Sequence, residues 1–167
     1  MLAKIIINHD PCYEIYVCSY NNYIREEKMI RRFNETHVSA NIYSYKENDP
    51  RVQLLIDGGL NENNRRTYGN FFSMISEMED FCNNSTKEFG VFFENDIFLK
   101  KTLLVDLPHA CEQLKILNLD VLLIGILLDV SPEEYGCNLI HIDKYNNKYY
   151  DFQDNLYGAH GFILTKK

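Results

Sequence analysis

The stretch FGVFFENDIFL, residues 89–99, decides the fold that we expect for this chain of 167 residues. Residues 89–93 form a short apolar run, rich in Phe and Val, that stops at charged residues. Such a run is typical of a buried strand rather than a helix. A strand that is apolar on both faces usually belongs to a covered, largely parallel sheet. Glu94 and Asp96 follow at spacing i, i+2, which points both carboxylates to the same side if the chain is extended.

The two acids come where the strand ends, and this position gives them a possible function. In open α/β sheets, ligands bind at the carboxyl ends of the strands. A pair of carboxylates there suits a divalent cation with oxygen ligands, and the cation can in turn hold a diphosphate. A solvated corner between strand and loop explains the same spacing equally well, so other parts of the chain must distinguish the two interpretations.

Composition indicates one soluble globular domain covering residues 1–167. The chain is 46% hydrophobic and 25% charged, and its length is enough for a substantial core. The net charge of −7 argues against a nucleic-acid-binding surface. An excess of acidic residues is compatible with a metal-dependent site but does not require one.

Cysteine usage and hydropathy predict a reducing, cytoplasmic location. The cysteines are odd in number and form no CxxC pair, so the sequence supports neither a disulfide framework nor a zinc site, and we expect most of them to be buried free thiols. The N-terminal apolar run is too short for a signal peptide. The longest apolar run, residues 121–128, is far shorter than the roughly 20 residues of a transmembrane helix, so no such segment is expected. The five cysteines are Cys12, Cys18, Cys82, Cys111 and Cys137.

Periodicity and turn residues predict alternating strands and helices. In residues 65–81, Phe71, Phe72, Ile75 and Met78 recur at helical spacing, together with Cys82, and we expect them to form the core face of a helix. Residues 52–56 fit either a strand or a helical turn, and Pro108 separates a possible first turn from the rest of helix 102–117. Strands are expected at 3–7, 14–18, 41–45, 89–93, 121–128, 138–142, 148–152 and 162–165, and helices at 24–33, 65–81 and 102–117.

Taken together, several segments resemble a known family in the same order along the chain. The shared features are an opening strand followed by an Arg-bearing helix, a helix before the acidic motif, a strand that ends in a DXD-type motif, and a late Gly-Ala-His segment. The chain is similar in these features to GT-A-fold glycosyltransferases, especially the lipopolysaccharide-biosynthesis (glycosyltransferase family 25-like) group. The segments are 15–25, 65–81, 91–98 and 157–163, and the strand at 119–125 resembles the family's D-x-x-x-L-G strand.

The resemblance implies an α/β, GT-A-like fold, with a mixed, mostly parallel sheet flanked by helices and a small β-rich C-terminal part. The implied nucleotide-binding half covers residues 1–100 and the acceptor-side half residues 101–167. The implied activity is that of a metal-dependent hexosyltransferase. Such an enzyme moves a sugar from a nucleotide-diphosphate sugar, with a UDP-sugar preferred, to a hydroxyl of a glycan or lipid-linked acceptor.

The implied cofactor is Mn²⁺ or Mg²⁺, held by Glu94, Asp96 and His160. A bound cation acts as a Lewis acid at the leaving oxygen of the diphosphate. The family group commonly has Glu-Asp-Asp where this chain has Glu94, Asn95 and Asp96. The asparagine removes one negative charge from the motif, but the first and last acids remain.

The loop after the first parallel strand is the expected nucleotide site, because it lies at the carboxyl edge of the sheet. Arg65 and Arg66 begin a helix and are expected to meet phosphate, together with the amides of the helix N-terminus. We expect the arginines at positions 25, 31 and 32 to form an exposed basic helix face. Contacts to base or ribose are expected from Ser19, Tyr20, Asn21 and Tyr45, and Glu94 is also expected to contribute to cofactor binding.

An inverting reaction would need a carboxylate base across the sugar from the leaving phosphate. Asp154 is the preferred candidate because it comes just before the Gly-Ala-His segment, and Asp129 and Asp151 are the alternatives. Two other functions stay open. One is a nucleotidyl- or phosphotransferase that uses the same acids for Mg²⁺. The other is a degenerate, non-catalytic domain that binds a nucleotide sugar or a protein partner, which Asn95 favours.

Overall fold

The computed structural model describes residues 11–20, 22–36, 38–45, 49–100, 102–126, 131–134, 136–151 and 159–166. The strand expected at residues 3–7 lies outside them. Within the described part, no helix is long and apolar enough to span a membrane.

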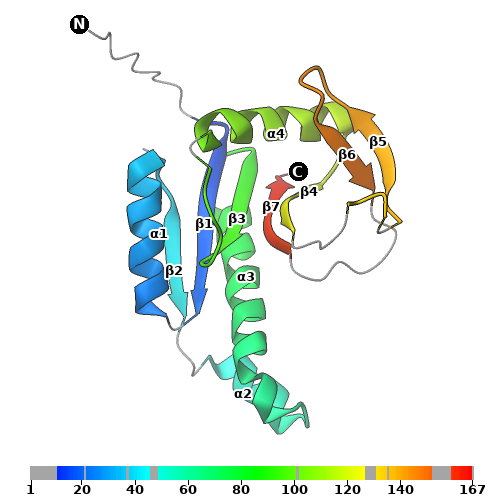
Figure 1. Ribbon diagram of the computed structural model, residues 1–167. Coiled ribbons are helices and arrows are strands. Elements are labelled where there is room, and N and C mark those ends of the chain that lie inside the picture. Colours follow the sequence, from blue (N-terminus) through cyan, green and yellow to red (C-terminus); the bar gives the residue numbers. More distant parts are fainter. Residues whose placement is uncertain are drawn as a thin grey trace, which may run out of the picture.

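A mixed five-stranded sheet forms the centre of the molecule, in the order β2-β1-β3-β7-β4 (Figure 1). β1 pairs in parallel with both β2 and β3, whereas β7 runs antiparallel between β3 and β4. This arrangement confirms the predicted α/β class with a mixed sheet flanked by helices. The strands are β1 (Tyr13–Tyr20), β2 (Asn41–Tyr45), β3 (Phe89–Glu94), β4 (Val121–Ile126) and β7 (Ala159–Thr165).

Helices α1 (Tyr23–Thr36) and α4 (Leu103–Leu117) cover one face of the sheet. Alternate residues of a strand point to opposite faces, and Ile15, Val17, Val91 and Phe93 point to this one. They pack with side chains from both helices in a single apolar cluster, which includes Met29, Phe33, Leu107, Cys111 and Leu114.

Helix α3 (Arg65–Asn84) covers the opposite face, where aromatic rings predominate. Tyr43, Tyr16, Phe92 and Phe162 stack in turn across four neighbouring strands, with ring centroids 6.0, 5.2 and 5.1 Å apart. Phe81 of α3 meets both Tyr16 and Phe92 edge-on.

Gly90 is needed under these rings. A Cβ atom at this position would lie 2.7 Å from the Phe92 ring and 2.9 Å from the Phe81 ring. The glycine in the middle of a buried strand therefore reflects a close approach of aromatic rings to the backbone.

The face that α3 turns to the sheet differs from the predicted one. Its fully buried positions are Gly69, Ser73, Glu77 and Phe81, at a spacing of four residues. Phe71 is 58% exposed and Cys82 is also exposed, so the expected stripe of apolar residues was wrong at these positions. The small residues at 69 and 73 let the helix approach the strands closely, which a stripe of large side chains would not.

In three other segments the structure settles an open prediction or corrects a wrong one. Residues 52–56 belong to helix α2 (Pro50–Asp57), which starts because Asp49 accepts a hydrogen bond from the Arg51 amide and Pro50 occupies the first turn. α4 is continuous through Pro108, so no separate turn precedes it. β4 is an edge strand with Val121 46% exposed, rather than a deeply buried one.

A hairpin of β5 (Asn138–Ile142) and β6 (Lys148–Asp151) forms the second sheet, as predicted. It is attached to α4 by two side-chain hydrogen bonds. The His109 Nε2 and Asp143 Oδ2 atoms are 2.6 Å apart, and His141 Nε2 lies 3.1 Å from Gln113 Oε1. Both histidines are thus structural, in agreement with the sequence-based expectation.

Candidate functional site

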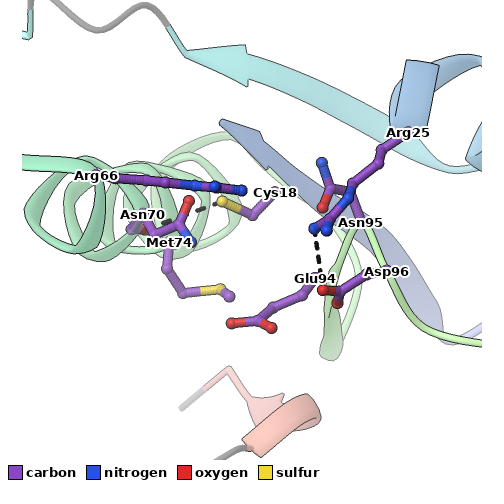
Figure 2. A pocket seen from close by; sticks show the side chains of 8 residues that line it. All are labelled: Cys18, Arg25, Arg66, Asn70, Met74, Glu94, Asn95 and Asp96. Atoms are coloured by element: carbon purple, nitrogen blue, oxygen red, sulfur yellow. Dashed lines mark hydrogen bonds and ion pairs between the residues drawn. The ribbon is translucent and has the colours of Figure 1, made fainter. Parts of the chain in front are cut away.

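A small pocket lies at the carboxyl ends of β1 and β3, between the first turns of α1 and α3 (Figure 2). β1 supplies one residue, α1 one, α3 three, and the end of β3 three. These residues are Cys18, Arg25, Arg66, Asn70, Met74, Glu94, Asn95 and Asp96. Glu94 and Asp96, the two acids of the predicted metal-binding motif, therefore line one pocket.

The register of β1 and β3 explains which way the acidic motif points. Glu94 is the partner of Cys18 in the parallel ladder, so both belong to the α3 face of the sheet. The side chain of Asn95 turns to the other face. Its Nδ2 donates a 2.7 Å hydrogen bond to Ser19 Oγ, and Ser19 is fully buried. Asn95 thus fixes the strand end instead of offering its side chain to a cation.

An ion pair connects the acidic motif to α1. Arg25 Nη1 lies 3.1 Å from Asp96 Oδ2, with both side chains about two-fifths exposed (40% and 42%). Asn22 holds the first turn of α1 because its Oδ1 accepts a hydrogen bond from the Arg25 amide at 3.1 Å. An ion pair this exposed contributes little to stability, so a ligand can displace it at low cost.

A second arginine of α1 also holds the loop after β3. Arg32 donates to the carbonyl of Ile97, and its guanidinium lies 4.6 Å from the centre of the Phe98 ring. Arg25 and Arg32 thus both reach this loop and are only partly exposed, whereas a fully exposed basic face was predicted. Arg31 is exposed, as expected.

The two arginines that begin α3 have different surroundings. Arg65 is engaged away from the pocket, with its Nε 2.6 Å from Glu62 Oε1 and its Nη2 2.9 Å from Gln53 Oε1. Arg66 is exposed and lines the pocket. Within the described part of the chain Arg66 makes no ion pair, which leaves its guanidinium available for an anionic ligand.

Cys18 lines the pocket and is only 5% exposed. Its Sγ lies 3.9 Å from the carbonyl oxygen of Asn70. Burial raises the pKa of the Cys18 thiol to about 12, and the carboxyl groups of Glu77 and Glu94 add to this shift. The thiol is therefore neutral near pH 7 and is unsuited to act as a nucleophile.

The donor set of the pocket determines which metal chemistry fits. No group of three or more His, Cys, Asp or Glu side chains suited to a metal occurs among the described residues. Mg²⁺ is usually held by only one or two carboxylates, with substrate phosphates and waters completing its shell. Glu94 and Asp96 fit a cation that arrives with a phosphate ligand, and they do not form a closed protein site.

The structure describes the backbone of His160 but not its side chain. In the antiparallel β3–β7 ladder, Gly161 is the partner of Phe93, the residue before Glu94. The backbone of His160 consequently lies near the strand end that carries the acids. The ligand role of its side chain stays a prediction.

The other predicted site residues are dispersed. Ser19 is buried against Asn95, so it does not face a nucleotide. Tyr20 and Tyr45 are partners at the carboxyl ends of β1 and β2, with only their backbone described. Asp151 is exposed at the end of β6 in the hairpin sheet. Asn21, Asp129 and Asp154 lie outside the described residues.

Four residues of the pocket were not predicted from the sequence as site residues: Cys18, Arg25, Asn70 and Met74. Arg25 had a usable signal, because it comes three residues after the capping Asn22, in the first turn after a strand. Asn70 had none, since its role depends on how α3 lies across β1.

No protein-family model matches the chain, and no curated protein matches it either.

Proposed function

We propose that this protein is a metal-dependent glycosyltransferase that moves a sugar from a nucleotide-diphosphate sugar, with a UDP-sugar as the preferred donor, to a hydroxyl acceptor. One observation carries the proposal. Two carboxylates from a single strand end, Glu94 and Asp96, share a pocket with two guanidinium groups, Arg25 and Arg66, at the carboxyl edge of the sheet.

The charges of this pocket suit a diphosphate together with a divalent cation. Two arginines alone would bind phosphate, but two carboxylates beside them repel it. A divalent cation between the carboxylates and the phosphates removes this repulsion, and when bound it would also stabilise the negative charge on the leaving diphosphate. A phosphate-free metal site would instead need more oxygen ligands than the pocket supplies.

The four charged residues of the pocket then have distinct proposed roles. Glu94 and Asp96 would hold the cation. Arg25 would leave Asp96 and bind a donor phosphate, because its exposed ion pair is weak. Arg66 would bind the diphosphate from the α3 side. The acceptor base stays a prediction, with Asp154 preferred over Asp129 and Asp151.

Thermal unfolding with Mn²⁺ and a panel of UDP- and GDP-sugars tests the proposal. We expect a donor and Mn²⁺ together to raise the melting temperature, because a ligand that binds only the folded state stabilises it. Asp96→Ala and Glu94→Ala should abolish the joint shift. Glu79→Ala is the matched control, since Glu79 is an exposed acid on α3 that does not line the pocket. An unchanged joint shift in both pocket variants would contradict the proposal.

Arg25→Gln provides a second test, because it should change the affinity for Mn²⁺ and the affinity for the donor in opposite directions. Without nucleotide, Mn²⁺ should bind this variant more tightly, because the guanidinium no longer competes for Asp96. With the cation saturating, the donor should bind about tenfold more weakly, because a charge-assisted bond to phosphate is lost. Loss of both affinities would mean that Arg25 only supports the loop.

The product of turnover separates this proposal from nucleotidyl transfer. Release of nucleoside diphosphate and transferred sugar supports a glycosyltransferase, whereas release of pyrophosphate from a triphosphate supports the other class. Binding without turnover of any donor would identify a non-catalytic domain.

A further inference from the structure

The amino end of the sheet, opposite the pocket, holds two cysteines that the proposed function does not use. Cys12 comes directly before β1, and its carbonyl oxygen accepts hydrogen bonds from the amides of Glu88 and Phe89 at 3.1 and 3.2 Å. These bonds fix Cys12 beside the start of β3. The Cys12 side chain is exposed.

Helix α4 passes beside the same end of β1 and β3 (Figure 1). Lys115 of α4 has its Nζ 2.5 Å from Glu88 Oε2 and 5.4 Å from the centre of the Phe89 ring. Cys111 lies one turn before Lys115, on the same side of the helix, and is 1% exposed. This side of α4 therefore faces the junction that holds Cys12.

The two cysteines are neighbours at this junction. Cys111 packs in the same apolar cluster as Tyr13, the residue after Cys12, and the Cys12 and Cys111 side chains are close enough to interact electrostatically. The other three cysteines have different surroundings. Cys18 lies in the pocket, Cys82 is exposed on α3, and Cys137 precedes β5.

We propose that Cys12 and Cys111 form an intramolecular disulfide when the protein meets a small-molecule disulfide such as oxidised glutathione. The bond would join the beginning of β1 to the middle of α4, at the end of the sheet opposite the candidate site. The disulfide would make the protein sensitive to oxidation without altering the pocket.

The reaction proceeds by two thiol–disulfide exchanges. The Cys12 thiolate attacks one sulfur of oxidised glutathione, which forms a mixed disulfide and releases one glutathione thiolate that takes up a proton. The Cys111 thiolate then attacks the Cys12 sulfur and displaces the second glutathione. Two protein thiols are oxidised, and one glutathione disulfide is reduced to two thiols.

The environment of each cysteine sets this order. Cys12 is exposed and accessible to the oxidant, whereas burial raises the pKa of Cys111, and the nearby Cys12 adds to this shift. The second exchange is thus the slow step, because little Cys111 thiolate is present near neutral pH. Its rate should rise about tenfold for each pH unit while Cys111 remains mostly protonated.

Peptide mapping of the full chain after incubation with oxidised glutathione tests the proposal. We expect a cross-linked peptide pair containing Cys12 and Cys111, no dimer, and a higher melting temperature that dithiothreitol reverses, because the bond closes a long loop. The joint effect of Mn²⁺ and donor on the melting temperature, if present in the reduced protein, should persist in the cross-linked one.

Two variants keep the outcome interpretable. Cys12→Ser changes an exposed side chain, so the protein should fold normally but form no cross-link. Cys82→Ser removes the other exposed cysteine and should cross-link as the wild type does. Stable glutathionylation of Cys12 without closure, a link that involves Cys82, or a disulfide dimer would each overturn the proposal.

Discussion

The two faces of the central sheet differ in what they bury. The face under α1 and α4 is filled by aliphatic and aromatic side chains in one continuous apolar cluster. The face under α3 has the aromatic stack at its centre, but α3 also buries Ser73 and Glu77 against it. Cys18 and Glu94 continue this second face to the pocket.

The difference shows that the site-bearing face includes polar groups at a cost in stability. Both carboxylate oxygens of Glu77 are buried and make no hydrogen bond in the described structure. Burial raises the pKa of Glu77 to about 9, so the group is neutral at pH 7. An apolar residue there would pack at lower cost, and residues of that kind form the cluster on the opposite face.

The largest expected effect comes from breaking the aromatic stack. Phe92→Ala removes the ring that touches Tyr16, Phe81 and Phe162. We expect the free energy of unfolding to fall by about 3–5 kcal/mol, because a large buried side chain is lost and a cavity remains. Urea denaturation measures this change. Phe98→Ala, at a side chain 88% exposed, is the control and should cost about 1 kcal/mol or less. Similar losses in both variants would contradict the role of the stack.

A pH titration of stability tests the burial of Glu77. Between pH 4.5 and 9 the unfolded chain has lost the Glu77 proton while the folded chain keeps it. The unfolded state therefore binds fewer protons, and stability should fall as the pH rises through this window.

We expect the wild type to lose about 1.4 kcal/mol per pH unit relative to Glu77→Gln, or about 2–3 kcal/mol between pH 5 and 7. Denaturation curves at several pH values give this difference directly. Glu79→Gln, at an exposed position of the same helix, should follow the wild type. A wild type parallel to Glu77→Gln across the window would show that the carboxyl group is ionised in the fold.

The smallest effect concerns the bond from Asn95 to the first face. Asn95→Ala should lower stability by about 1–2 kcal/mol, because it leaves the buried Ser19 hydroxyl without its partner. Asn95→Asp should retain most of the stability, since Ser19 can donate to the new carboxylate. A double-mutant cycle with Ser19→Ala measures the coupling, and a value near zero would contradict the contact.

The Asn95→Asp variant also sharpens the comparison between the faces. Its new carboxylate would be held by Ser19 in the pocket wall, so the effect of Mn²⁺ on the melting temperature should match that of the wild type. A much larger effect would mean that position 95 faces the cation after all.

Much of the secondary structure follows from local chemistry. The strand at 41–45, the β5–β6 hairpin and the apolar strand at 89–93 were predicted from short-range patterns, which depend on turn residues and side-chain alternation. Asp49 and Pro50 likewise provide the start of α2, although the ambiguous pattern at 52–56 concealed it.

The buried face of α3 could not be predicted in the same way. The helix has large apolar residues on more than one side, and the pattern selected the side with Phe71 and Cys82. The sheet selected the side with Gly69 and Ser73, because small residues permit close packing against β1. Such a choice depends on the partner surface, which lies far away in the sequence.

The sequence by itself determined the α/β class, the strand that ends at the acidic motif, and the placement of Glu94 and Asp96 at the carboxyl edge of a sheet. All three follow from local periodicity. Only the tertiary structure decided that Arg25 pairs with Asp96, that Arg66 lines the same pocket, that Asn95 bonds to Ser19, and that β7 lies beside β3. Those contacts join residues tens of positions apart, and their geometry is set by strand register and helix packing rather than by any local pattern.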